Sequence, residues 1–341
     1  MTPSAPAISA PGLFRALALA LSITALFLEA NTVDFYNDEF LSGLLSARPQ
    51  LARVSIGSPR FTGSPHFRIS TRAVDKFFRV APSRLQELSL RECLGHTTKL
   101  PASVASLSSL RVFRLCSKVL RSLPAEMCCM SALQELHLNC PLLQQLPETF
   151  GRLTRLEHLS FTDCTEMRRL PDSLGDLSSL TSLHVDGSRS RSRCGRRYAD
   201  QSALGPSLKH LIICMGTPGN GRLGGTLSTR LCSLLSLTHL SIDCLTSSSH
   251  LPSSLGHVTN LRWLSLRGTW LCLPLSLSRL APCLHSLKLH YSGSTTSEYL
   301  QRVLPSFLSN LTSLTNLHLR NMHVPSPRPP WRVCTPSARF T

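Results

Sequence analysis

One short pattern of leucines recurs ten times along this 341-residue chain and restricts its fold more than any other feature. The pattern is L-x-x-L-x-L, and successive copies start 23 to 30 residues apart. The ten copies begin at Leu85, Leu110, Leu133, Leu156, Leu180, Leu208, Leu237, Leu261, Leu284 and Leu314. A regular period of this length indicates a solenoid, in which each unit stacks on the unit before it.

Each unit contains two periodicities, as the string "LEHLSFTDCTEMRRLPDSLGDLSSL" from Leu156 to Leu180 shows. The L-x-L alternation predicts a short strand with its leucines on one face. The later leucines are three or four residues apart, which predicts one or two helical turns. A Leu-Pro pair separates the two parts in seven units, where the proline ring favours the start of a helical segment. A single unit is too small to bury its own apolar face, so neighbouring units must cover it.

The repeats resemble those of leucine-rich-repeat proteins, because Leu156 to Pro171 follows their pattern L-x-x-L-x-L-x-x-C-x-x-(Leu/Met)-x-x-L-P. They are most similar to the type found in plant nucleotide-binding disease-resistance receptors and in plant Ras-group leucine-rich-repeat proteins. The resemblance implies an α/β solenoid of about ten repeats: a horseshoe with a parallel concave sheet and short helical or irregular convex segments. It also implies a non-enzymatic module that recognises a partner protein, in plant-type defence or intracellular signalling.

The repeats divide the chain into four segments. The solenoid is expected over 85–322, with lengthened repeats at 180–236. Residues 31–84 form an N-terminal flank, and residues 323–341 form a proline-rich tail that we expect to be disordered. Residues 1–30 contain a run of apolar residues that fits either a signal peptide or a helix packed on the first repeat.

Two questions about the N-terminal part stay open at this stage. The string "LARVSI" at Leu51 is either a degenerate repeat or part of the flank. We expect a cytoplasmic protein without an integral membrane span, because the apolar run is too short to cross a bilayer. If residues 1–30 are a signal peptide, the protein is secreted instead. Core positions such as Cys93, Cys164 and Cys244 favour free thiols in a reducing compartment.

The candidate binding surface is the concave face of the predicted sheet, from which the residues that flank the inward leucines point outward. Seven of the thirteen histidines occupy the 30 positions that flank the inward leucines. Trp263 occupies another of these outward positions and is a candidate aromatic anchor. Three interpretations of these histidines stay open: exposed surface residues without a binding role, a pH-sensitive protein contact, or a metal site. The residues predicted to contact a partner protein are His137, His158, His184, Asp186, His210, His239, Asp243, Trp263 and Arg267.

A strong excess of basic residues points to a second kind of partner. Lysine and arginine number 36 against 19 acids, which gives a formal net charge of +17 and favours contact with polyanions. The string "GSRSRSRCGRR" at 187–197 concentrates this charge in one loop. That loop is either a solvated insertion or a weak contact for RNA or acidic lipid. Its candidate residues are Arg189, Arg191, Arg193, Arg196 and Arg197.

No motif for catalysis or cofactor binding is accompanied by the other residues that such a site would need. Gly219, Gly221 and Gly224 match a dinucleotide-binding fingerprint, but any repeat of this kind supplies the strand, turn and helix around them. We therefore expect a loop there, no cofactor, no metal and no catalytic residue. Two alternative functions stay open: the substrate-receptor arm of a ubiquitin ligase, and a basic RNA- or membrane-associated repeat protein. Steep loss of binding with salt would favour the latter.

Overall fold

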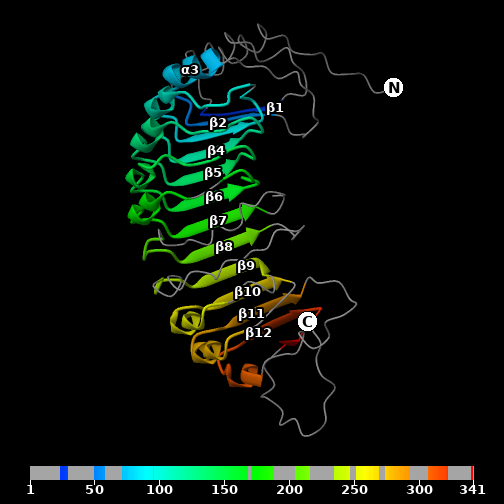
Figure 1. Cartoon of the computed structure of the whole chain (residues 1–341). Coiled ribbons are helices and arrows are strands. Elements are labelled where there is room, and N and C mark those ends of the chain that lie inside the picture. The colour runs from blue at the N-terminus through cyan, green and yellow to red at the C-terminus, as the bar shows by residue number, and fades with distance from the viewer. Residues whose placement is uncertain are drawn as a thin grey trace, which may run out of the picture. The chain divides into compact units, whose positions relative to one another are not determined.

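The computed structural model describes residues 24–29, 50–57, 71–94, 96–167, 170–187, 204–215, 234–245, 251–268, 273–291, 306–321 and 339–340 (Figure 1). The chain forms two compact units, Met1–Leu156 and Glu157–Thr341.

The first unit contains a parallel sheet in which each strand pairs with the next strand in the sequence. An α-helix and short 3-10 helices (η) lie in the segments between strands, on one side of the strands (Figure 1). The strands are β1 (Ala25–Glu29), β2 (Arg53–Gly57), β3 (Glu87–Arg91), β4 (Val112–Cys116) and β5 (Glu135–Asn139). The helices are α3 (Thr71–Val80), η2 (Ala102–Ser106), η3 (Ala125–Cys129) and η4 (Phe150–Arg152).

The second unit repeats the same arrangement, again with parallel pairing between consecutive strands. Its strands are β6 (His158–Thr162), β7 (Ser182–Gly187), β8 (His210–Met215), β9 (His239–Leu245), β10 (Trp263–Gly268), β11 (Ser286–Tyr291), β12 (Asn316–Arg320) and β13 (Arg339–Phe340). The described helices are η5 (Asp172–Asp176), η9 (Ser253–His257), η10 (Leu275–Leu280) and η12 (Ser306–Asn310).

Each of the ten leucine patterns forms one strand, from β3 to β12, so the predicted α/β leucine-rich-repeat solenoid is confirmed. The strands begin at the third position of each pattern. In β3 to β11 the two alternating apolar residues are buried in the core, whereas Leu317 and Leu319 of β12 are half-buried. In β6 the two buried residues are Leu159 and Phe161, with exposed fractions of 1% and 0%. Phe113, Phe150 and Phe161 are among the largest fully buried side chains.

The Leu-Pro pairs set the start of the helical segments, as the sequence predicts. Pro101, Pro124, Pro171, Pro252 and Pro274 are the N-caps of five 3-10 helices, with φ between −75° and −64°. This is the range that the pyrrolidine ring imposes, so each proline holds the chain ready to turn into the helix.

The described cysteines are free thiols, and several lie in the core. Cys93, Cys128, Cys140 and Cys164 are buried. Burial raises the pKa of Cys93 to about 12, which keeps the thiol protonated and unreactive. The prediction of core thiols therefore holds for Cys93 and Cys164, whereas the side chain of Cys244 lies outside the described residues.

The N-terminal flank contains more structure than the sequence indicates. Strand β2 lies on the string at Leu51, in register with β3. Strand β1 lies within the segment for which a packed helix was an alternative, so for residues 25–29 a helix is wrong. The reason is tertiary pairing: β1 bonds to β2 along its length and buries Leu26 in the strand pattern. Among the described residues, no helix is long and apolar enough to cross a membrane.

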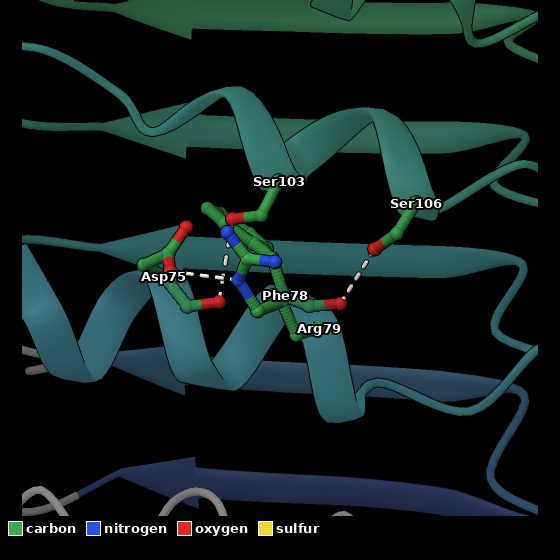
Figure 2. Close-up of polar contacts among 5 residues, drawn as sticks. All are labelled: Asp75, Phe78, Arg79, Ser103 and Ser106. Atoms are coloured by element: carbon green, nitrogen blue, oxygen red, sulfur yellow. Dashed lines mark hydrogen bonds and ion pairs between the residues drawn. The ribbon is translucent and has the colours of Figure 1, made fainter.

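Helix α3 takes the place of a 3-10 helix in front of β3. It buries Val74, Phe77 and Phe78, which follow each other at the spacing of one helical face. Two serines of η2 then bond to carbonyl groups of this helix (Figure 2). Ser106 Oγ donates to the Phe78 carbonyl at 2.6 Å, and Ser103 Oγ donates to the Asp75 carbonyl at 3.3 Å. Carbonyls in the last turn of a helix lack partners inside it, so the Ser106 bond ties the end of α3 to the next repeat.

Burial decides the cost of removing an aromatic ring from the first unit. Phe113→Ala should lower the free energy of unfolding by about 3–5 kcal/mol, because it leaves a cavity in the core. Phe27 is 68% exposed, so Phe27→Ala should change stability by no more than about 0.5 kcal/mol. Urea denaturation of the two variants measures the difference, and equal losses would contradict the assigned core.

The Ser106 bond should stabilise the end of α3. Ser106→Ala should lower stability by about 0.5–1.5 kcal/mol and speed hydrogen exchange in the last turn of α3. Ser108→Ala is the matched control, because Ser108 is exposed like Ser106 but its hydroxyl forms no hydrogen bond within the described residues. If both variants exchange at the same rate as the wild type, the contact does not hold the helix.

Candidate partner-binding face

The side of the second unit's sheet opposite its buried leucines carries most of the predicted contact residues. We call this surface the polar face; it consists of the third-, fifth- and seventh-position side chains of β6 to β12. Positions in one column pair across neighbouring strands, so residues far apart in sequence stand side by side. The face includes His158, His184, Asp186, His210, His239, Asp243, Trp263 and Arg267.

Three rings form a row along the third column, which we call the aromatic row. His210 on β8 pairs with His239 on β9, which pairs with Trp263 on β10. The two imidazoles are stacked, with ring centroids 4.4 Å apart and planes at 19°. The centroids of His239 and Trp263 are 6.1 Å apart, and their planes are tilted by 33°. The rings therefore form one continuous patch across three strands.

The protonation of the row follows from its surroundings. The pKa of His210 is lowered, first by burial and then by the positive charges of His239, His158 and Lys209. Its ring is therefore mainly neutral at neutral pH, which avoids repulsion within the stack. The Thr238 hydroxyl bonds to Nδ1 of His239 at 2.9 Å and fixes that ring's orientation.

The seventh column carries charge of both signs. Asp186, Cys214 and Asp243 follow each other on β7, β8 and β9. Burial raises the pKa of Asp243, while Arg267 and a hydrogen bond from the Cys214 thiol act in the opposite direction. The Arg267 guanidinium Nη1 lies 4.0 Å from Asp243 Oδ2, so the two form a loose ion pair.

The remaining predicted residues are not brought into this group. His137 lies in the first unit, on β5, where its Nε2 is 3.4 Å from Glu135 Oε2. Glu135 also pairs with Arg114 at 3.3 Å. Residues 188–203 and 216–233 lie outside the described part of the chain, and they include the arginine–serine loop and the glycine motif. Within the described residues, no group of three or more His, Cys, Asp or Glu side chains is arranged to hold a metal ion.

The structure also groups residues that the sequence analysis did not select. Lys288, His290, His318 and Arg320 lie together on β11 and β12. Ser241, in the fifth column, is only 9% exposed although it belongs to the polar face. Counting outward positions along each repeat places these residues on the face, but only the strand register shows which charges are neighbours.

Comparison with known proteins agrees with this fold. A family described as "Leucine-rich repeat region" matches residues 78–244. No curated protein matches the chain. The match covers 78–244, and the strands on either side continue the same fold. The resemblance to plant resistance receptors and to Ras-group proteins stays a prediction.

Three solved structures illustrate the similarity. A leucine-rich-repeat protein of Leptospira interrogans is 19% identical, with a TM-score of 0.62, 94% of this chain covered and 78% of that chain. TLR13, solved in a complex with ssRNA13, is 18% identical with a TM-score of 0.61 over 89% of this chain and 41% of that chain. Toll of Drosophila, solved in a complex with Spatzle, is 16% identical with a TM-score of 0.53 over 84% of this chain and 38% of that chain. At these identities the likeness concerns the fold alone.

The stacking of the two histidines should be visible in their titration. His239→Ala should raise the pKa of His210, because the change removes a neighbouring positive charge and exposes the His210 ring to water. NMR titration of the histidine ring protons measures this shift. His318→Ala is the control and should leave His210 unchanged. An unchanged His210 in the His239 variant would mean that the rings do not stack in solution.

Proposed function

We propose that this protein is a non-enzymatic recognition module that binds a partner protein on the polar face. The observation that carries the proposal is the aromatic row of His210, His239 and Trp263. Large rings with few rotatable bonds supply contact area at low entropic cost, and tryptophan is enriched among residues that dominate binding energy. Leucine-rich repeats generally serve protein recognition, and the parallel strands hold these rings in fixed positions.

The surroundings of Trp263 support its role as the anchor. On either side of it in the strand register, His239 offers a ring and Ser286 offers a small side chain. Trp263 is half-buried among these neighbours. A partner's side chain can therefore cover the free part of the indole without first moving a large neighbour.

We infer the biological setting from the resemblance of the repeats. It is plant-type defence or intracellular signalling in the cytoplasm, with secretion as the alternative location. In one similar structure a repeat protein, Toll, is in a complex with Spatzle. Two further functions compete with this proposal: the substrate-receptor arm of a ubiquitin ligase, and a basic repeat protein that associates with RNA or membranes. The net charge of +17 favours the second of these alternatives, and TLR13 was solved with ssRNA13.

Replacement of His210 and Trp263 from the aromatic row, together with His184 of the polar face, tests the proposal directly. A partner is first identified by co-purification with the wild-type chain and then titrated against purified variants. The variant His184→Ala, His210→Ala, Trp263→Ala should bind it at least about 100-fold more weakly, because loss of one anchor residue such as Trp263 costs about 2–4 kcal/mol of binding free energy.

The matched control removes two histidines and one apolar side chain from outside the polar face: His257→Ala, His285→Ala, Leu275→Ala. Leu275 is 74% exposed, so this variant should fold and bind like the wild type. If the first variant keeps full affinity, the polar face is not the contact surface. If the partner is RNA and binding falls steeply with salt, the RNA-associated function replaces the proposal.

A further inference from the structure

The end of the polar face formed by β10, β11 and β12 has a distinct charge. Arg267, Lys288 and Arg320 project from it, together with His290 and His318; we call these five residues the basic patch. The register pairs Arg267 with His290, His290 with Arg320, and Lys288 with His318, so the patch is continuous across the three strands. Its residues come from three repeats and are drawn together only by the strand pairing.

Little negative charge in the described structure balances the basic patch. No acidic residue belongs to β10, β11 or β12. Arg267 has the loose pair with Asp243 on β9. Lys288 and Arg320 are exposed, and among the described residues neither forms an ion pair. Two cations on neighbouring strands therefore lack a carboxylate partner within this part of the chain.

The pKa of His290 is lowered in part by the positive charges of the basic patch. Burial lowers its pKa first, and Arg267, Arg320 and His318 lower it further, while Asp243 acts in the opposite direction. These groups come from β9, β10 and β12, and Lys288 is on the same strand as His290. The net effect of the facing charges is repulsion of a proton, which means attraction for a negative group.

The charge distribution limits which negative partner fits. Asp186 and Asp243 lie on the same face, on β7 and β9. A long polyanion that ran across the sheet would meet these carboxylates after leaving the basic patch. A short acidic segment would not, because it would end within the patch. A protein segment with a few clustered carboxylates therefore fits better than a nucleic acid strand.

The distance between Trp263 and the basic patch sets a second requirement for the partner segment. Trp263 and Arg267 are on one strand, four residues apart and on the same side, so they are roughly 13 Å from each other along β10. The space between them carries the small side chain of Ser265. An extended segment that covers this space brings its aromatic or apolar residue to Trp263 and its carboxylates to the basic patch.

We propose that the basic patch docks an acidic segment of the partner protein, with an apolar or aromatic residue of that segment against Trp263. The proposal rests on the proposed function and specifies the chemistry of the partner. Binding should also take up a proton, because carboxylates near His290 favour its charged form. Affinity should therefore rise as the pH falls from neutral towards the ordinary pKa of histidine.

The test uses the full chain and a defined probe. The probe is a fluorescein-labelled peptide of alternating glutamate and serine with one central tryptophan, and binding is followed by fluorescence anisotropy. The variant Lys288→Glu, Arg320→Glu should bind the probe about tenfold more weakly than the wild type, because it reverses two of the attractive charges. The control variant Arg262→Glu, Arg279→Glu has the same net charge, but its changes lie before β10 and in η10. The control should keep an affinity within about twofold of the wild type.

Three results would overturn the proposal. Equal losses in the two variants would mean that the probe responds to net charge alone. Equal affinity for a probe without tryptophan would mean that Trp263 is not part of the site. Tighter binding of single-stranded oligouridylate of the same charge, also abolished by the Lys288 and Arg320 changes, would assign the patch to nucleic acid.

The partner identified by co-purification separates this proposal from the proposed function. Loss of that partner from both the His184/His210/Trp263 variant and the Lys288/Arg320 variant supports both ideas. Loss from the first variant only leaves the polar face as the contact surface and rejects the acidic segment. Retention by both variants rejects both.

Discussion

The contact between equivalent apolar side chains of successive repeats is the interaction on which the rest of the structure depends. In β6 and β7, Leu159 pairs with Leu183 and Phe161 pairs with Val185, and none is more than 5% exposed. A single repeat orders more residues than its own few apolar contacts can stabilise. The core therefore exists only as a stack, and each repeat is stable because its neighbours cover it.

The same stacking fixes the positions of the polar side chains. Backbone bonds such as those from the Thr181 and Ser182 amides to the Glu157 carbonyl, at 2.9 and 3.0 Å, set the register of one repeat on the next. A slip by one residue would move the leucines to the solvent side, so the register cannot drift. This is why His210 meets His239 from 29 residues away, at a ring separation of 4.4 Å. The aromatic row and the basic patch are consequences of core packing.

The repeated part of the fold could be predicted because its signal is local and repeated ten times. The prolines before the 3-10 helices and the two leucines of each strand act within one repeat, so the sequence displays them directly. Strand β1 could not be recognised in the same way. All of its residues but Glu29 lie in a mostly apolar run. Such a run does not distinguish a strand from a helix until pairing with β2 selects the strand. The sequence does not predict helix α3, because its apolar face is short and its end is held by Ser106, which belongs to the following repeat.

Only the part of the candidate site that follows from positions within one repeat could be predicted from the sequence. The histidines stood out because their number on the outward positions was high, and His239 and Trp263 follow from counting along each repeat. The basic patch did not stand out, since Arg267, Lys288 and Arg320 are 21 and 32 residues apart and the chain is basic throughout. What separates them from the other basic residues is the absence of acids from β10 to β12, and that is a property of neighbouring strands.

Exposed and buried residues alternate along each strand, so the residues available for binding differ from those that stabilise the fold. Residues of the polar face stand between buried leucines, so a change at Lys288 leaves Leu287 and Leu289 in place, at 2% and 0% exposure. Substitutions at exposed positions away from caps and cores usually cost less than about 0.5 kcal/mol. The chemistry of one part of the face can therefore change without loss of the stack beneath it. The fold of this protein therefore does not determine where acidic, aromatic and basic side chains lie on the polar face. Their distribution can instead be matched to the partner.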